Sequence, residues 1–419
     1  MAISFEAASS TYPITSGPVT RAGTPAFVWM LALAMGISSI VLVEPAPVDA
    51  VMLVLLALGT AMGVVRLQAV AVLPGMLLAG LALANIVSIP NAPDTTRAVF
   101  YCFVTLYLIT SWLVFVGSVD FYEVPLVKML FRGYSVAGLI AAGLALASYF
   151  HIIGFQSMLL LYGRPKGPFK DPNVYGPFLV PLGVMAIMGC LPGVGRAMRI
   201  AVAVVASLGV ALSYSRACWI NYAISLAVFV ILDLVLPSKS GKRSVAIKPL
   251  IAFAGVAVLA IAGIVQVPSV KAMLAVRLGQ GGLQGYDQIR FQTQRMALQA
   301  AIDNPLGIGP GQAEGVFNYA THSSYMRVLS ENGIFGLFCF VGFLLASTLQ
   351  AVRNACIAPS HQARALYLAA CACICGHLVN SAVVDTVHWR HLWFLLALPW
   401  ISPWALSLQP IVDSPSGNH

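Results

Sequence analysis

Charged side chains that could bind and activate a substrate gather in residues 290–336 of a chain that is otherwise apolar. Arg290, Arg295 and Arg327 are candidates for an anionic ligand, because a guanidinium binds phosphate oxygens in a bidentate way. His322 is the candidate general base, because an imidazole titrates near neutral pH. A lone histidine at a helix start can equally be a structural hydrogen-bonding group. The residue types indicate a site that binds an anion and holds a possible general base.

The same segment carries signals for two helices that would position these side chains. Residues 290–302 contain neither Gly nor Pro, and Asn304-Pro305 should end that helix because the residue before a proline avoids helical geometry. A second helix should begin near His322 and stop at Asn332-Gly333. Its cap should be one of three hydroxyl residues: Thr321, Ser323 or Ser324. The GIGPG loop between the two helices lacks the Lys-Ser/Thr of a P-loop, so it is weak as a phosphate-binding motif.

Arg216 lies in the sequence LSYSRACW, between two apolar runs. A cation in that position is costly and is by default a candidate for function. The alternative is an interfacial arginine bonded to lipid headgroups.

A second basic segment, GRPKGPFKDPN, spans residues 163–173 and is rich in Pro and Gly, which predicts a shaped loop. It holds Arg164, Lys166 and Lys170, with Asn173 at its end. These residues would form a phosphate-binding rim, or they would be snorkelling anchors for the helix that follows.

The composition places the chain in a membrane. It is 59% hydrophobic and 9% charged, against about 25% charged in a soluble domain. The fold class is therefore an all-α polytopic membrane protein with about twelve transmembrane helices. The predicted spans are 26–43, 48–65, 68–89, 98–117, 126–150, 174–191, 199–214, 217–236, 249–266, 333–351, 364–384 and 391–408. One long, partly helical loop, 267–325, joins the ninth and tenth helices.

A single membrane domain, 26–408, should fill the chain between an inner N-terminal segment, 1–25, and an inner tail, 409–419. The loop and its surroundings then face outward. Basic residues that collect outside, against the positive-inside preference, indicate an anionic ligand there. An inverted topology is the alternative.

Neither disulfides nor a metal site is expected. The eight cysteines lie in apolar spans or in a predicted inner loop, where small packing residues are the usual role. No two outer acids form the Asp-x-Asp pair that often holds a divalent ion against a diphosphate. We therefore expect a mechanism without metal or other cofactor.

Three blocks in this order resemble the bacterial O-antigen ligase and polymerase superfamily: SYSR at 213–216, DNPLGIGPG at 303–311 and THSSYMRVLSENGIFG at 321–336. The GPFKDPN block at 167–173 resembles the ligase branch. One departure is Gln294, where the family often has Trp four residues after the arginine that matches Arg290.

The resemblance implies an inner-membrane glycosyltransferase with a periplasmic active site. An O-antigen ligase transfers a glycan from undecaprenyl diphosphate to a sugar hydroxyl of lipid A-core, with inversion and without metal or nucleotide. Its partners are the two glycolipids and membrane lipids, not nucleic acid. The resemblance assigns catalysis to Arg216, Arg290 and His322. The predicted substrate-binding residues are Arg164, Lys166, Lys170, Asn173, Arg295, Tyr325 and Arg327.

Two other functions compete with the ligase. A polymerase of the same superfamily has the same donor chemistry but a glycan acceptor, and often has two large outer loops where this chain has one. A transporter or flippase would place its charges near the bilayer midplane within repeated halves. Here the charges gather at one face and no repeat is visible, which disfavours transport.

Overall fold

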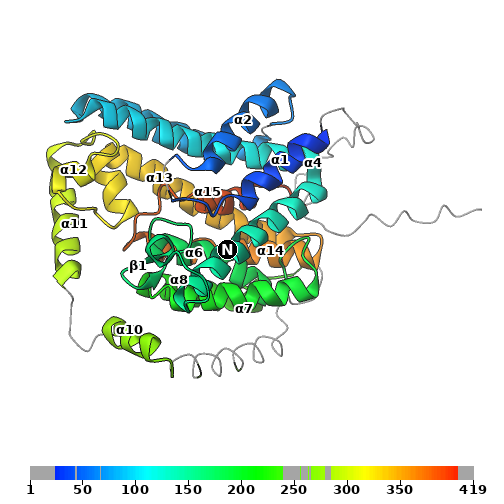
Figure 1. Ribbon diagram of the computed structural model, residues 1–419. Helices are drawn as coiled ribbons and strands as arrows, with labels where there is room; N and C mark the ends of the chain where they lie inside the picture. The colour runs from blue at the N-terminus through cyan, green and yellow to red at the C-terminus, as the bar shows by residue number, and fades with distance from the viewer. Residues whose placement is uncertain are drawn as a thin grey trace, which may run out of the picture.

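The computed structural model is a bundle of helices (Figure 1) and describes residues 24–42, 45–66, 68–238, 255, 263, 266–278 and 285–403. The principal helices are α1 (Thr24–Gly36), α2 (Pro47–Ala61), α3 (Val72–Ser88), α4 (Thr95–Tyr149), α6 (Pro172–Ile187), α7 (Arg196–Leu212), α8 (Arg216–Val235), α13 (Ser324–Ile357), α14 (His361–Ser381) and α15 (Arg390–Ala397). Shorter elements connect them: η1 (Ala69–Ala71), η2 (Ile89–Asn91), α5 (Gln156–Leu159), the antiparallel pair β1 (Leu160–Leu161) and β2 (Arg164–Pro165), and η3 (Leu398–Trp400).

Six helical stretches among the described residues are long and apolar enough to cross a membrane, which confirms the all-α membrane class. They are Ala69–Asn91, Thr95–Val119, Pro125–Tyr149, Arg216–Val235, Ser324–Ile357 and His361–Ser381. Each overlaps a predicted span. Three further predicted spans correspond to shorter apolar helices: Ala26–Gly36, Pro47–Ala61 and Pro172–Ile187.

The remaining three predicted spans leave the total of about twelve unconfirmed. The span predicted at 199–214 corresponds to α7, which has 17 residues and is not among the six candidates. The span at 249–266 lies outside the described residues except at its positions 255, 263 and 266. The span at 391–408 begins as α15 and η3 and then passes beyond the described residues.

The 55-residue α4 contains two predicted spans and doubles back on itself (Figure 1). Phe115 in its first half and Phe131 in its second both contact the ring of Phe394, at centroid distances of 5.1 and 5.5 Å. In a straight helix these two residues would be about 24 Å apart. The helix therefore bends sharply between them, near Pro125, where a proline interrupts the backbone hydrogen bonds.

The core of the bundle lies around α14, in which 78% of the most apolar 18-residue stretch is buried inside the protein. It packs against α8, α13 and α6. Near its start the buried Arg364 forms an ion pair with Asp233 of α8 and donates to the carbonyl oxygen of Leu236 at 3.1 Å. Charges at this depth are tolerated when they are paired and hydrogen-bonded.

The long loop carries α10 (Pro268–Leu278), α11 (Gly285–Asp303) and α12 (Ala313–Phe317), all on the same side of the view in Figure 1. The predicted helix at 290–302 forms the C-terminal part of α11, which ends directly before Asn304 as expected. Ser323 caps α13 by accepting a hydrogen bond from the backbone nitrogen of Met326 at 3.4 Å. At Gly333 the backbone of α13 is non-helical, with φ 68° and ψ −175°, which confirms the predicted break.

Candidate active site

The sequence SYSR forms the turn between α7 and α8. Tyr214 has a left-handed backbone, with φ 51°, and its hydroxyl lies 2.7 Å from the hydroxyl of Tyr149. Ser215 caps α8 by accepting a hydrogen bond from the backbone nitrogen of Cys218. These contacts fix Arg216 in the first turn of α8, with an exposed side chain.

The loop before α6 is fastened to this turn through Arg164. The buried Arg164 donates from Nε to the carbonyl oxygen of Ser213 at 3.1 Å and from Nη2 to Oδ1 of Asn173 at 3.2 Å. Asp171 caps α6 by accepting a hydrogen bond from the backbone nitrogen of Asn173 at 2.5 Å. Arg164 thus joins the basic loop at 163–173 to the SYSR turn. A contact of Arg164 or Asn173 with a substrate stays a prediction.

The two lysines of the same loop differ in their surroundings. Lys166 donates from Nζ to the carbonyl oxygen of Phe169 at 2.9 Å. Burial lowers the pKa of Lys166, against the opposing effect of Asp171. Lys170 is exposed and lines the large cavity described below. Of the two, Lys170 is the better placed to reach a ligand in that cavity.

His322 stands at the junction of the loop and α13, with α11 beside it. Its backbone is left-handed, with φ 48°, a conformation that few residues other than Gly adopt. Gln294 of α11 donates to the carbonyl oxygen of Thr321 at 3.2 Å. The imidazole packs against the ring of Tyr319 at a centroid distance of 5.2 Å. Three separate constraints therefore set the position of one half-buried imidazole.

Charged groups from four parts of the chain act on the pKa of His322. Burial lowers its pKa from the usual 6.5, and the Arg290 guanidinium of α11 lowers it further, while Asp171, Asp385 and Glu314 act in the opposite direction. The net effect keeps the imidazole neutral at neutral pH. A neutral imidazole between a guanidinium and carboxylates can accept a proton from a hydroxyl.

Arg327, predicted to bind substrate, is buried in a network of acids. It pairs through Nη1 with Asp385 and through Nε with Glu331 at 3.3 Å, and it lies 3.8 Å from Glu314. Its guanidinium also lies over the ring of Tyr101, 5.3 Å from the centroid. Burial raises the pKa of Asp385, but Arg327, His388 and nearby hydrogen bonds bring it below its usual range. Arg327 therefore fixes the carboxylate of Asp385.

The other two predicted binding residues, Arg295 and Tyr325, come from different helices. Arg295 is exposed on α11, one turn after Arg290. Tyr325 is half-buried and donates from its hydroxyl to the carbonyl oxygen of Leu378 at 2.8 Å. That bond joins α13 to α14. A substrate contact of either residue stays a prediction.

The GIGPG loop is used for packing rather than for presenting donors. The backbone nitrogens of Ile308 and Gly309 donate to the carbonyl oxygens of Ser330 and Glu331, at 2.9 and 3.1 Å. Gly307, Gly309 and Gly311 all have positive φ. The loop thereby locks onto α13 just before its break, and these two nitrogens are not available to a phosphate.

A cavity of ≈ 520 Å³ opens between α2, α4 and the segments that carry Lys170, Glu314 and Asp385. Its polar end contains Asp385 and Glu314, two of the groups that act on His322. The polar lining also includes Asp49, Lys170, Arg327, His388 and Arg390. Its other wall is apolar, and Leu53, Phe100 and Phe103 in that wall are 52%, 49% and 66% exposed. The cavity thus joins a charged end to a face that would meet lipid.

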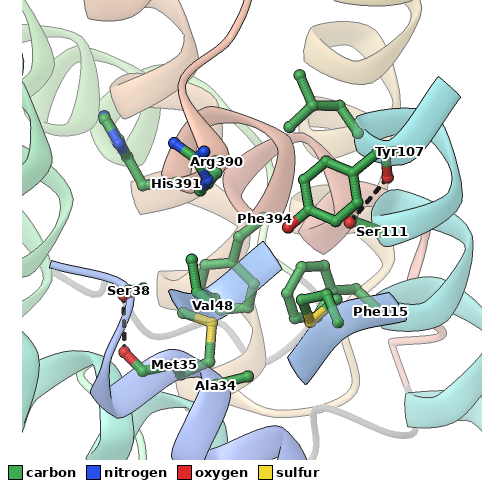
Figure 2. Close-up of a pocket in the computed structure, with 12 residues that line it drawn as sticks. Ala34, Met35, Ser38, Val48, Tyr107, Ser111, Phe115, Arg390, His391 and Phe394 are labelled. Atoms are coloured by element: carbon green, nitrogen blue, oxygen red, sulfur yellow. Dashed lines mark hydrogen bonds between the residues drawn. The ribbon is translucent and has the colours of Figure 1, made fainter. Parts of the chain in front are cut away.

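The inner limit of this cavity is the ion pair between Asp49 and Arg390. Arg390 donates to both carboxylate oxygens of Asp49 at 2.5 Å. Beyond it is a second, much smaller space of ≈ 20 Å³, lined by side chains of α2, α4, α15 and of α1 and the residues after it (Figure 2). Tyr107, Leu108 and Arg390 line both spaces. About one water molecule would fill the inner one, so a substrate is confined to the outer cavity.

Sequence reasoning named most of the charged groups of this site but missed Tyr101, Arg97 and the role of Asp49. Arg97 pairs with Glu314 at 2.8 Å, and Tyr101 lies under Arg327. Asp49 and Tyr101 lie in the apolar spans predicted at 48–65 and 98–117, and Arg97 directly precedes the second of these. Among the described residues, no group of three His, Cys, Asp or Glu side chains could hold a metal ion.

The comparisons with known proteins point to one family. No curated protein matches the chain. The family model described as O-antigen ligase matches residues 201–341, the part that contains Arg216, Arg290 and His322. The order of the sequence blocks and this match agree, and together they support membership of the O-antigen ligase and polymerase superfamily.

Proposed function

We propose that the protein is an O-antigen ligase that transfers a glycan from undecaprenyl diphosphate to a sugar hydroxyl of lipid A-core on the periplasmic face of the inner membrane. The observation that carries the proposal is the position of His322. This half-buried imidazole is acted on by the Arg290 guanidinium and by three carboxylates, and two of these, Glu314 and Asp385, line a cavity that also has an apolar wall.

The reaction is a single displacement at the anomeric carbon of the donor sugar. The acceptor hydroxyl forms the new bond to that carbon and gives its proton to His322, while the bond to the diphosphate breaks. Undecaprenyl diphosphate leaves with the electron pair, and attack from the opposite face inverts the anomeric centre. Arg290 and Arg216 would bind the leaving diphosphate, where preformed positive charge stabilises the transition state.

The acceptor would enter the cavity beside Asp385. Within that lining, Arg327 and Arg390 are already paired with carboxylates. Paired charges offer hydrogen bonds to sugar hydroxyls without attracting a diphosphate strongly. The exposed apolar wall of Leu53, Phe100 and Phe103 suits the acyl chains of a lipid acceptor. The cavity therefore suits a lipid-anchored acceptor, while the donor diphosphate would bind at Arg290 and Arg216.

A polymerase is the second candidate, because family membership is compatible with both activities. Cells that lack the protein distinguish the two by their glycolipids. For a ligase, lipid A-core should lack O-antigen while long chains accumulate on the carrier. A single repeat unit on the carrier would identify a polymerase and overturn the proposal. Normal lipopolysaccharide together with blocked export of a lipid would identify a transporter.

A further inference from the structure

A second large cavity, of ≈ 370 Å³, lies far from His322 and plays no part in the proposed reaction. It is bounded by α4, the loop between α6 and α7, and the first turn of α14. Its lining is Lys128, Arg132, Gly189, Cys190, Leu191, Pro192, Gly193, Val194, Gly195, Arg199 and Gln362. Three of these described lining residues are cations, and none is acidic. The cavity is thus suited to an anion.

The cations are held in place by the backbone of the loop. Arg132 donates from Nε to the carbonyl oxygen of Gly193 at 2.6 Å, and Arg199 lies 3.5 Å from that of Gly189. A guanidinium has five N–H donors, so each arginine keeps donors for a ligand. Lys128 is half-buried on the wall formed by α4. The three cations come from two helices, α4 and α7, and line the same cavity. Cations that served only to orient the protein in the membrane would not need to share a cavity.

The loop itself adds to the positive potential. Gly193 has φ 71°, and a Cβ there would lie 2.7 Å from the carbonyl oxygen of Lys128, so the loop lies directly against α4. Gly195 caps the start of α7, a helix of 17 residues. The first turn of a helix carries unpaired N–H groups and partial positive charge. This end of α7 therefore reinforces the side-chain cations.

The cavity lies at the membrane surface opposite the candidate active site. The 16-residue α6 begins directly after Asp171, which acts on His322, and ends at the loop that bounds the cavity. Its length is about 24 Å. In the same way α14 begins beside Gln362 and ends shortly before Asp385. The cavity is therefore at the level of the lipid headgroups of the other leaflet.

We propose that this cavity binds the phosphate headgroup of an anionic glycerophospholipid in the leaflet opposite the active site. Its position at headgroup level selects a lipid over a free anion, and basic pockets between membrane helices on the inner side suit anionic headgroups. The inference stands independently of the proposed transferase activity.

The test is lipid binding to the purified full-length protein by native mass spectrometry and by thermal shift in detergent. Phosphatidylglycerol, phosphatidylcholine and inorganic phosphate are the three probes. Of the three probes, only phosphatidylglycerol should remain bound to the wild-type protein and raise its thermal midpoint. Lys128→Gln should weaken this binding about 5-fold, and Lys128→Gln combined with Arg199→Gln should weaken it by at least about 10-fold. Both leave the Arg132 bond to the loop intact, so folding should be preserved.

Arg353→Gln is the matched control, because Arg353 is an exposed cation near the end of α13, at the same face, and lies outside the cavity. It should bind phosphatidylglycerol like the wild type. An equal loss in Arg353→Gln would mean non-specific surface attraction and would overturn the proposal. So would wild-type binding by the double variant, equal stabilisation by phosphatidylcholine, or stabilisation by inorganic phosphate that competes the lipid away.

Discussion

Gln294 in α11 donates a hydrogen bond to the carbonyl oxygen of Thr321, the residue before His322. The bond joins the helix that carries Arg290 to the loop that carries the candidate base. Gln294 stands at the position where the resemblance to the family leads us to expect a tryptophan. A polar side chain here holds the loop directly rather than by packing.

Replacing Gln294 should therefore disturb the position of His322 without touching a substrate. We expect Gln294→Leu to lower the transfer rate about 5-fold, which corresponds to roughly 1 kcal/mol for one neutral hydrogen bond. The affinity for the donor lipid should change little. Single-turnover transfer and donor binding by purified protein measure the two quantities. Gln299→Leu is the control, because Gln299 is an exposed residue further along α11. An equal loss of transfer rate in that variant would contradict the positioning role of Gln294.

The acid limb of the transfer rate should lie at lower pH than expected for a histidine with the usual pKa of 6.5. Burial, followed by Arg290, lowers the pKa of His322 from 6.5, so the active neutral form persists to lower pH. Arg290→Gln removes a charge that lowers this pKa and should move the acid limb of the profile to higher pH. Glu314→Gln removes a charge that raises it and should move the limb to lower pH. Shifts in the same direction for both variants would show that another group controls the profile.

His322 and Arg290 should fail in different ways when replaced. His322→Ala should lose about 10²- to 10⁴-fold in transfer rate, the usual contribution of a general base, while donor binding persists. Arg290→Lys keeps the charge but not the bidentate fork, so both donor binding and rate should fall. Donor-lipid affinity and transfer rate, each measured on protein of normal yield, decide the matter. Wild-type transfer by His322→Ala would return this histidine to a structural role.

Local signals in the sequence predicted the supports of the site. Asn304-Pro305 ended α11 where expected, Ser323 capped α13, and Gly333 broke it, because each depends on the conformational preferences of adjacent residues. The apolar runs likewise predicted the helices that are long and apolar enough to cross a membrane, although not their total number.

Contacts between distant segments could not be predicted in this way. The side chain of Gln312 bonds to the backbone nitrogen and the carbonyl oxygen of Asp94, 218 residues away, and Arg327 lies over Tyr101. Such pairs depend on how α3, α4 and α13 pack, and apolar side chains that pack by shape leave no local pattern. The continuous helix between the predicted spans 98–117 and 126–150 was missed for a related reason, because a charged stretch between two spans can form a loop or continue as helix.

Removing the buried Arg327 should destabilise the protein strongly. Arg327→Met leaves the carboxylates of Asp385 and Glu331 without their cation, and breaking a buried pair typically costs about 3–5 kcal/mol. Arg97→Met is the control, because its pair with Glu314 has side chains 33% and 42% exposed and should contribute no more than about 1 kcal/mol. The midpoint of thermal unfolding in detergent measures both. A smaller loss in Arg327→Met than in Arg97→Met would mean that Arg327 is not the centre of this network.

Gly333→Ala should destabilise the junction between the loop and α13. Gly333 has φ 68° and ψ −175°, a conformation that is essentially confined to glycine, and a Cβ there would overlap the carbonyl oxygen of Pro305. The backbone strain alone costs on the order of 1–3 kcal/mol, so the thermal midpoint in detergent should fall. Transfer should fall as well, because the GIGPG loop that packs on this break would move and take Glu314 with it. Gly143→Ala in α4 is the matched control, since nothing lies within 4 Å of the added methyl group, and its midpoint and rate should remain at wild-type values. If Gly333→Ala behaves like Gly143→Ala, the break in α13 does not position the site.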